Sequence, residues 1–343
     1  MTGSARIPDV EGILKGYDPE RLTVAVIASH TALQILLGAK REGLRTLALA
    51  PPGRGWFYSR MWFVDEVLEM DLGTLSSAAG ELTSRNAILI PHGSYVEYVG
   101  WRAALELRVP TFGNRYLLEW EADQRRKMSL LEAAGLRTPR TYSSPDEVDG
   151  PVIVKLYGAK GGRGYFFARD ADELRRRLGS VREPHIIQEY VVGVPAYHHF
   201  LHSPLRDRVE LFGFDLRYES NVDGRTFGLA DPTFVVVGNL PLVLRESLLP
   251  GVARDGESFA RAVLEHTGRP PIGPFSLESI VRDTLEIVYF EFSGRIVAGT
   301  SVYMVHGSPY SLMYFREPVD MGRRIAMEIR EAAESGRLGE VTT

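Results

Sequence analysis

The chain has 343 residues, enough for two or three domains, and its 44% hydrophobic and 24% charged residues are ordinary for a globular protein. A net charge of -4 argues against nucleic-acid binding, and no apolar run is long enough to span a membrane. The lack of cysteine excludes disulfides, thiolate nucleophiles and cysteine-bound metals. Without an apolar signal peptide, we expect a cytoplasmic protein that binds neither nucleic acid nor membranes.

The first third of the chain alternates apolar strands with helices. Strands are expected at residues 21–29, 44–50, 64–70 and 87–90, and helices at residues 30–40, 75–83 and 95–107. Such alternation is typical of a parallel, doubly wound sheet. We therefore predict an N-terminal α/β domain over residues 1–115.

The rest of the chain separates its strands from its helices. Helices are expected at residues 114–135, 170–178, 242–266 and 320–333. Strands are expected at residues 152–156, 164–168, 186–191, 197–203, 208–220, 225–230, 233–238, 275–282 and 286–292. This segregation predicts an α+β part, divided into units at residues 116–195 and 196–343.

A glycine-rich segment joins two predicted strands at residues 152–168, with the sequence VIVKLYGAKGGRGYFFA. Lys155 lies on the first strand, and the loop contains Gly158, Lys160, Gly161 and Gly162. Glycine lets backbone N–H groups approach phosphate oxygens, although a flexible hairpin with solvated charges is the alternative. No Lys-Ser/Thr pair opens a following helix, so the segment is not a P-loop and instead resembles the phosphate lid of the ATP-grasp fold.

The segment QEYVVG, residues 188–193, resembles the ATP-grasp hinge strand, where the backbone meets adenine. The alternative is a plain buried strand that ends in glycine.

Two glutamates near the end of the sequence suggest a metal site. Glu278 and Glu291 lie on neighbouring predicted strands joined by a turn around Asp283, so antiparallel pairing would bring both carboxylates to one end of the ribbon. Carboxylate pairs suit Mg²⁺ that bridges nucleotide phosphates, and the nearby Arg295 can meet a transferring phosphoryl group. Ser293 stands where the ATP-grasp pattern has Asn. A solvated acidic pair is the alternative.

Polar side chains also follow two strands of the predicted parallel sheet. Ser29, His30 and Thr31 follow the first strand, and Ser94 lies after the strand at residues 87–90. Ligands of open sheets bind at the carboxyl ends of strands, and helix N-termini there attract phosphate. A phosphorylated substrate is the hypothesis, and simple helix capping is the alternative.

Three histidines, at positions 198, 199 and 202, permit a zinc interpretation. In a strand His198 and His202 share a face while His199 points away, and no acidic third ligand is obvious. Substrate contact or cross-strand packing is favoured instead.

Several segments together closely resemble archaeal formate-dependent FAICAR (5-formaminoimidazole-4-carboxamide ribonucleotide) synthetases, of the ATP-grasp superfamily: IASHTALQILLGAKREG, PHGSYVEYVG, PTFGNR, VKLYGAKGGRGYF, QEYVVG and GNLPLVLRESLL. The resemblance implies a substrate-binding domain at residues 1–115 and small and large ATP-grasp subdomains at residues 116–195 and 196–343. It also implies a homo-oligomer, trimeric or hexameric.

The resemblance further implies ATP- and formate-dependent conversion of AICAR (5-aminoimidazole-4-carboxamide ribonucleotide) to FAICAR through formyl phosphate. Candidate catalytic residues are Lys155, Arg295 and His30, and the implied AICAR ligands are His30, Ser94 and Asn239. The implied ATP ligands are Lys127, Lys155, Gly158, Lys160, Gly161, Gly162, Glu189, Tyr190, Val191, Val192 and Glu219. Glu278 and Glu291 would hold Mg²⁺ or Mn²⁺. A paralogue with another nucleotide or acid and a catalytically silent nucleotide sensor remain alternatives.

Overall fold

The computed structural model describes residues 7–156, 164–220 and 235–343. The loop candidates Gly158, Lys160, Gly161 and Gly162 and the strand expected at residues 225–230 lie outside the described residues. Within the described ranges, no helix is both long and apolar enough to cross a membrane.

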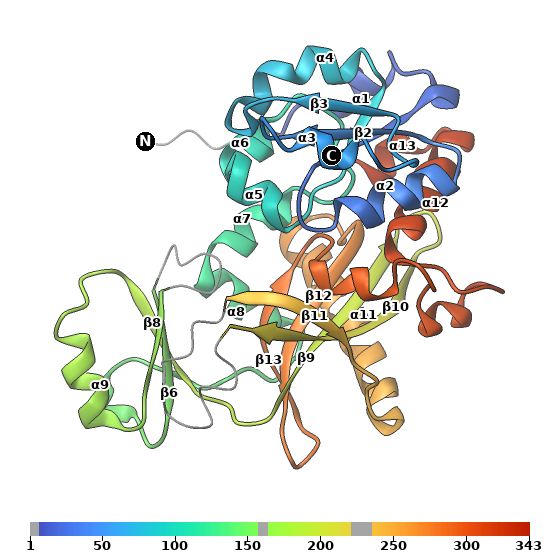
Figure 1. Cartoon of the computed structure of the whole chain (residues 1–343). Coiled ribbons are helices and arrows are strands. Elements are labelled where there is room, and N and C mark those ends of the chain that lie inside the picture. The colour runs from blue at the N-terminus through green and yellow to red at the C-terminus, as the bar shows by residue number, and fades with distance from the viewer. Residues whose placement is uncertain (1–6, 157–163, 221–234) are drawn as a thin grey trace.

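A parallel four-stranded sheet forms the upper part of the molecule in Figure 1. In the order β3-β2-β1-β4, its strands are β3 Glu66–Glu69, β2 Arg45–Ala50, β1 Thr23–Ile27 and β4 Ala87–Leu89. Val24 and Val26 of β1 enter one apolar core while Ala25 and Ile27 enter another, so both faces of the sheet are covered. This burial explains why the strand reads as a continuous apolar run, and it confirms the predicted doubly wound arrangement.

Short helices surround this sheet: α1 Val10–Leu14, η1 Pro19–Arg21, α2 Ala32–Arg41, α3 Gly55–Tyr58, η2 Leu72–Ala78, α4 Ala79–Thr83, α5 Gly93–Val99 and α6 Trp101–Glu106. The single helix expected at residues 95–107 is therefore two helices that meet at Gly100.

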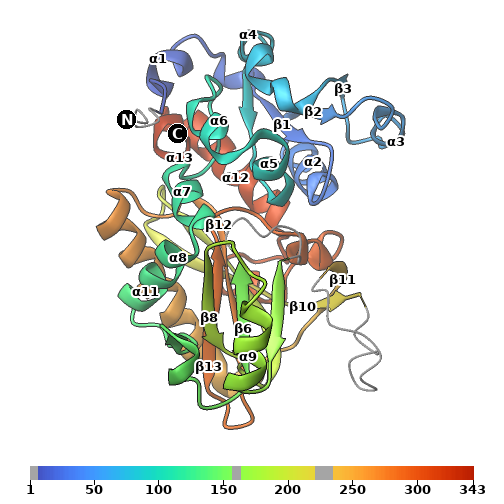
Figure 2. The ribbon, with the colours of Figure 1, turned by 90° about the vertical axis from the view of Figure 1, so that its left-hand side faces the viewer.

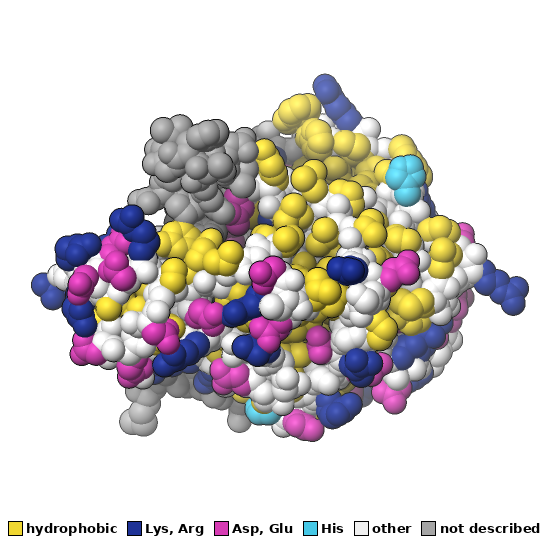
Figure 3. Space-filling view, turned by 90° about the horizontal axis from the view of Figure 1, so that it is seen from below, with side chains coloured by type: hydrophobic (Ala, Val, Ile, Leu, Met, Phe, Trp, Pro, Cys, Tyr) yellow, Lys and Arg dark blue, Asp and Glu magenta, His cyan; other side chains and the backbone are white. Residues whose placement is uncertain are grey.

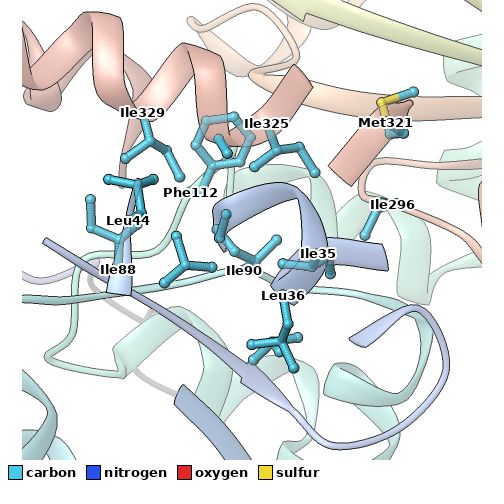
Figure 4. Close-up of a cluster of buried hydrophobic side chains, with 14 of the residues drawn as sticks. Ile35, Leu36, Leu44, Ile88, Ile90, Phe112, Ile296, Met321, Ile325 and Ile329 are labelled. Atoms are coloured by element: carbon cyan, nitrogen blue, oxygen red, sulfur yellow. The ribbon is translucent and has the colours of Figure 1, made fainter. Parts of the chain in front are cut away.

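The helix α12, Met321–Glu334, returns to this first sheet and packs on α2. Figure 4 shows Ile325 and Ile329 of α12 in the same apolar cluster as Ile35 of α2. The two helices approach so closely that a Cβ atom at Gly38 would lie 2.2 Å from the backbone nitrogen of Arg323. The helix was expected from the sequence, but its place on the first sheet was not. The unit predicted at residues 196–343 thus contributes a helix that packs against the unit predicted at residues 1–115.

A second, antiparallel sheet has the order β5-β8-β6-β7. Its strands are β5 Thr141–Tyr142, β8 His185–Glu189, β6 Val152–Leu156 and β7 Tyr165–Ala168, with η3 Pro145–Glu147 and α9 Ala171–Leu178 alongside. Leu174 of α9 packs with Val152 and Val154 in a small core of its own.

The helical run expected at residues 114–135, between the first and second sheets, is divided into α7 Tyr116–Ala122 and α8 Gln124–Ala133. The division falls at Asp123, whose side chain accepts hydrogen bonds from the first backbone N–H groups of α8.

The third sheet is antiparallel, has the order β11-β10-β9-β12-β13 and lies below the first sheet in Figure 1. Its strands are β9 Val194–Ser203, β10 Arg208–Glu219, β11 Val236–Pro241, β12 Gly273–Val281 and β13 Ile287–Ser293. Helical elements of this part are η4 Glu246–Leu248, α11 Leu249–Thr267, η5 Ala298–Tyr303, η6 Pro309–Met313 and α13 Leu338–Val341. Figure 2 shows α8 and α11 on one side of these strands.

Alternation divides the third sheet into an apolar and a polar face. Phe200 and Phe275 stack at 5.1 Å on the face covered by α11, where Phe259 of that helix completes the cluster. The opposite face carries the polar residues of the strands, and these face the candidate site. Seen from below, basic and acidic side chains are intermingled on the outer surface (Figure 3).

Candidate active site

A cavity of about 800 Å³ is lined by side chains of the second and third sheets and of the segments that follow β1 and β4 of the first sheet. Every candidate site residue that the structure describes lines it: His30, Ser94, Lys127, Lys155, Glu189, Tyr190, Val191, Val192, Glu219, Asn239, Glu278, Glu291 and Arg295. Segments far apart in the sequence thus meet at one place, as the resemblance implied. The role of each residue stays a prediction.

The two glutamates lie directly opposite one another in the pairing of β12 with β13. This register agrees with the antiparallel ribbon expected from the sequence. Glu278 is buried, and the side chain of Glu291 is 27% exposed. Ser293 lies two residues beyond Glu291, on the same face of the strand, and also lines the cavity.

Each carboxylate has a cationic partner. Lys127 Nζ lies 2.5 Å from Oε1 of Glu291, and Arg217 Nη2 lies 2.6 Å from Oε1 of Glu278. The Arg217 guanidinium also stacks over the ring of Tyr197, 3.8 Å from its centroid. Sequence reasoning missed Arg217. Its alternation with Asp215 on a predicted strand was the available signal, because both residues then point to the face that carries the glutamates.

Burial and charge act in opposite directions on this pair. Burial raises the pKa of Glu278, and the neighbouring charge of Glu291 adds to this against the effect of Arg217. Burial would also raise the pKa of Glu291, but Lys127 and Lys155 outweigh it and lower that pKa. The two carboxylates therefore differ in what dominates their pKa: burial at Glu278 and the neighbouring cations at Glu291.

The donor set fits a divalent cation that is shared with a phosphorylated ligand. Among the residues that the structure describes, the recorded hydrogen bonds reach Oε1 of Glu278 and of Glu291 and not Oε2, which leaves Oε2 of each as a hard oxygen donor. Among the described residues there is no group of three or more His, Cys, Asp or Glu that could hold a metal ion. A divalent cation at this place would take part of its coordination shell from Glu278 and Glu291 and the rest from phosphate and water oxygens.

Lys155 extends from β6 into the cavity without an ion pair in the described part of the chain. Its Nζ lies 5.3 Å from the ring centroid of Phe290. Burial lowers the pKa of Lys155 to about 8, although the charge of Glu291 opposes this shift. A buried ammonium without a protein partner has a strong preference for an anionic ligand.

Also in the lining of the cavity, His30 stacks on His92 with ring centroids 5.7 Å apart and planes 6° from parallel. His92 accepts a hydrogen bond at Nδ1 from the Ser94 backbone, so its Nε2 donates to the carbonyl of Ile27. Burial lowers the pKa of His92 to about 3 and that of His30 to about 4. Both rings are therefore neutral at pH 7.

The backbone holds His30 in place. Its φ of 53° is unusual for a residue other than glycine, which indicates local strain at the start of α2. Beside it, Ser29 Oγ and Ser94 Oγ lie 3.1 Å apart, and Thr31 Oγ1 is buried without a hydrogen-bond partner. These hydroxyls and the first N–H groups of α2 and α5 form the polar end that the sequence predicted.

Three further candidates have partners within the protein. Arg295 forms an ion pair with Glu121 at 2.6 Å, while its buried Nε has no partner. Glu189 pairs with Arg282 and, through its backbone N–H, with the carbonyl of Arg140. Asn239 donates from Nδ2 to Asp215.

The histidines of β9 are buried in the third sheet. His198 contacts Ser279 and the rings of Phe214 and Tyr289, and His199 lies between Ser276 and Asp215. These contacts of His198 and His199 with neighbouring strands agree with the cross-strand packing favoured from the sequence.

Comparison with known proteins gives two family models of unknown function and several named relatives. The domain of unknown function DUF1297 matches residues 179–343, and the protein of unknown function DUF1246 matches residues 24–142. The chain is 64% identical to a 5-formaminoimidazole-4-carboxamide-1-(beta)-D-ribofuranosyl 5'-monophosphate synthetase of Caldivirga maquilingensis, over 98% of this chain and 100% of the relative.

Solved structures show the same fold. The IMP biosynthesis protein PurP of Thermococcus kodakaraensis is 32% identical, with a TM-score of 0.78 over 93% of this chain and 100% of that chain. An N5-carboxyaminoimidazole synthetase of Staphylococcus aureus complexed with ADP is 11% identical, with a TM-score of 0.63 over 90% of this chain and 77% of that chain.

The three sheets, the lysine on β6 and the paired glutamates on β12 and β13 define a protein of the ATP-grasp fold. This likeness also agrees with the glycine-rich segment of the sequence. The chain belongs to the 5-formaminoimidazole-4-carboxamide-1-(beta)-D-ribofuranosyl 5'-monophosphate synthetase family, called here the FAICAR synthetase family.

Proposed function

We propose that this protein is an ATP-dependent ligase that forms a C–N bond: it formylates AICAR with formate and yields FAICAR, ADP and phosphate in purine (IMP) biosynthesis. The observation that carries the proposal is a single cavity lined by two chemically different groups of residues. One group, called the ATP end, comprises Lys155 and the glutamate pair, and the other, called the AICAR end, comprises His30 and Ser94. A relative that is 64% identical bears the name of this activity.

The proposed chemistry explains why ATP is needed. A free carboxylate resists attack by an amine, whereas phosphorylation of formate by ATP gives formyl phosphate, whose phosphate is a good leaving group. The 5-amino nitrogen of AICAR attacks the formyl carbon, the C–O bond to phosphate breaks, and the nitrogen loses a proton. Water would hydrolyse the acyl phosphate, so the reaction requires an enclosed cavity.

The ATP end follows from charge and backbone geometry. Lys155, Lys127 and Arg217 place three cations around the two glutamates, a pattern that suits a triphosphate with a divalent cation. We assign Mg²⁺ or Mn²⁺ to Glu278 and Glu291; such an ion would neutralise charge on the transferring phosphoryl group.

The adenine base is assigned to the segment after β8. The structure records no hydrogen bond to the backbone N–H or carbonyl groups of Val191 and Val192 in the described ranges, and both residues line the cavity. A base edge can pair with such free backbone groups. Glu219, which also lines the cavity, is assigned to the ribose.

The AICAR end uses neutral groups. His30 has a low pKa and is therefore uncharged, so it can bind phosphate or the imidazole by hydrogen bonds rather than as a cation. Ser94 and the helix N-termini beside it add donors for a phosphate. Arg295 lies close enough to lower the pKa of His30, and we assign it to the reacting acyl phosphate. Homo-oligomerisation and a cytoplasmic location stay predictions.

Phosphate release tests the activity. Purified protein with Mg-ATP should release phosphate only when AICAR and formate are both present, and FAICAR should form in equal amount. Release with another acid would favour the paralogue with a different substrate. Nucleotide binding without any turnover would favour the silent sensor.

Substitution of the metal-side carboxylate tests the assigned site. Glu291→Gln should reduce turnover by roughly 100-fold or more, the scale for losing one group that stabilises transition-state charge, while AICAR still binds. Glu286→Gln, the same change at the turn of the same hairpin, should leave turnover unchanged because Glu286 pairs with Arg137 and Arg282 in the described part of the chain and does not line the cavity. If turnover survives in Glu291→Gln, the metal assignment is wrong.

A further inference from the structure

A line of buried hydrogen-bonding side chains lies behind Asn239 in the third sheet. Asp215 on β10 is at its centre: Oδ1 lies 2.8 Å from Nε2 of His199, and Oδ2 lies 2.6 Å from Nδ2 of Asn239. His199 Nδ1 lies 2.9 Å from Oγ of Ser276. Of these four residues only Asn239 lines the cavity, and the other three are buried.

The serine–histidine–aspartate order resembles a nucleophilic triad, but its burial excludes that role. Ser276 and His199 do not reach the cavity, so no substrate can meet the serine hydroxyl. The backbone of η5 covers Asp215 so tightly that a Cβ atom at Gly299 would lie 2.0 Å from its Oδ1. The line of side chains therefore acts on a ligand only through Asn239.

The chemistry of Asp215 fixes the orientation of the Asn239 amide. A serine hydroxyl can donate to Nδ1 of His199, which leaves the Nε2 hydrogen to donate to Asp215. A carboxylate only accepts, so Asn239 must turn its amino group toward Asp215. Its carbonyl oxygen Oδ1 is left for the cavity, and the structure records no hydrogen bond to that oxygen among the described residues.

We propose that Asp215, held by His199, is a positioning residue that presents Asn239 to the cavity as a hydrogen-bond acceptor. This wall of the cavity then selects a ligand N–H or O–H group and disfavours a carboxylate or phosphate oxygen. The inference rests on the proposed function, in which the ligand is AICAR. Its exocyclic amino and carboxamide groups carry N–H donors of the required kind.

Exchange of the side chains at positions 215 and 239 tests whether residue 239 presents a hydrogen-bond acceptor to the cavity. In Asp215→Asn, the new amide still accepts from His199, but it donates toward Asn239, which must flip and present its amino group to the ligand. Asn239→Asp places two carboxylates side by side. In the double variant Asp215→Asn/Asn239→Asp, residue 215 donates to residue 239, whose second oxygen faces the cavity as an acceptor, and the net charge equals that of the unsubstituted protein.

The measurement is the Kd for AICAR by titration calorimetry, together with KM for AICAR, KM for ATP and kcat. Each single variant should weaken AICAR binding by roughly 10- to 100-fold, as expected when a buried polar group faces the wrong partner, while KM for ATP stays unchanged. The double variant should recover at least about tenfold of that loss. Asp255→Asn is the matched control, because Asp255 pairs with Tyr289 away from the cavity.

The outcomes distinguish failure of this inference from failure of the proposed function. Normal AICAR affinity in Asp215→Asn, or a double variant as weak as the single variants, would overturn the inference, since a merely structural role gives no rescue by exchange. Failure of the unsubstituted protein to bind AICAR or to form FAICAR would instead overturn the proposed function, and this inference with it.

Discussion

Gly93, the first residue of α5, lets the ring of His30 lie close to the start of this helix, where it stacks on His92. A Cβ atom at this position would lie 2.6 Å from Nε2 and 2.7 Å from Cε1 of His30. In the variant Gly93→Ala the added methyl group must therefore displace the imidazole. The fold itself should tolerate alanine here, because Gly93 is the first residue of α5 and the three atoms nearest the added Cβ all belong to the His30 side chain. The substitution thus separates the geometry of the site from the stability of the fold.

The required displacement follows from the contact distances. Ordinary van der Waals contact begins near 3.4 Å, so the His30 ring must move by about 0.8 Å. The ring lies at the end of an exposed side chain, so it yields by rotating away from Gly93 and changes its stacking on His92. A misplacement of this size can cost roughly 100-fold at an active site, so we expect the KM for AICAR to rise by about 10- to 100-fold.

Steady-state kinetics with AICAR, formate and ATP varied in turn measure this effect. KM for ATP should not change, because the three atoms nearest the added Cβ all belong to His30 and none to the assigned adenine segment. Gly80→Ala is the matched control: it makes the same change in α4, where nothing lies within 4 Å of the new Cβ. An unchanged KM for AICAR in Gly93→Ala, with normal stability, would refute the placement of AICAR beside His30.

Two further predictions concern single cations. Lys155 has a pKa of about 8 and only its ammonium attracts a triphosphate, so the affinity for ATP should be constant below pH 8 and fall above it by up to about tenfold per pH unit. Lys155→Arg, titrated with ATP from pH 7 to pH 9.5, should abolish this dependence; a flat profile in the unsubstituted protein would contradict the assignment. The buried guanidinium of Arg115 donates to backbone carbonyls at the end of α6, so Arg115→Met should lower the free energy of unfolding by about 3 kcal/mol in urea titration. A loss below about 1 kcal/mol would show that water replaces these hydrogen bonds.

The sequence predicted the bounds of an element well where its hydrophobic periodicity agrees with its burial in the structure. The strand β6 begins and ends at the expected residues, because Val152, Val154 and their neighbours are β-branched and apolar. The expected helix at residues 242–266 instead begins as η4 at Glu246 and continues as α11. Pairing between distant elements was harder to predict. The contact of α12 with α2 leaves no local signal, since an amphipathic helix shows that it has an apolar face but not which partner covers it.

The candidate site was predictable where one strand or turn carries the chemistry. Glu278 and Glu291 could be paired because a single hairpin joins them, and pairing in an antiparallel ribbon follows from chain reversal. The line from Ser276 through His199 to Asn239 was missed. It crosses strands β12, β9, β10 and β11, and only the register between these strands, which no local pattern sets, brings the side chains together.

The contact of α12 with α2 has a consequence for the order of events during protein synthesis. Residue 41 ends α2 and residue 321 begins α12, a separation of 280 positions. At about 5 to 20 residues per second, a ribosome needs roughly 15 to 60 s to add that length. During this interval α12 has not yet been synthesised, and the apolar residues that it later packs against are exposed to solvent. Such exposed apolar surface on a nascent chain favours binding by a chaperone.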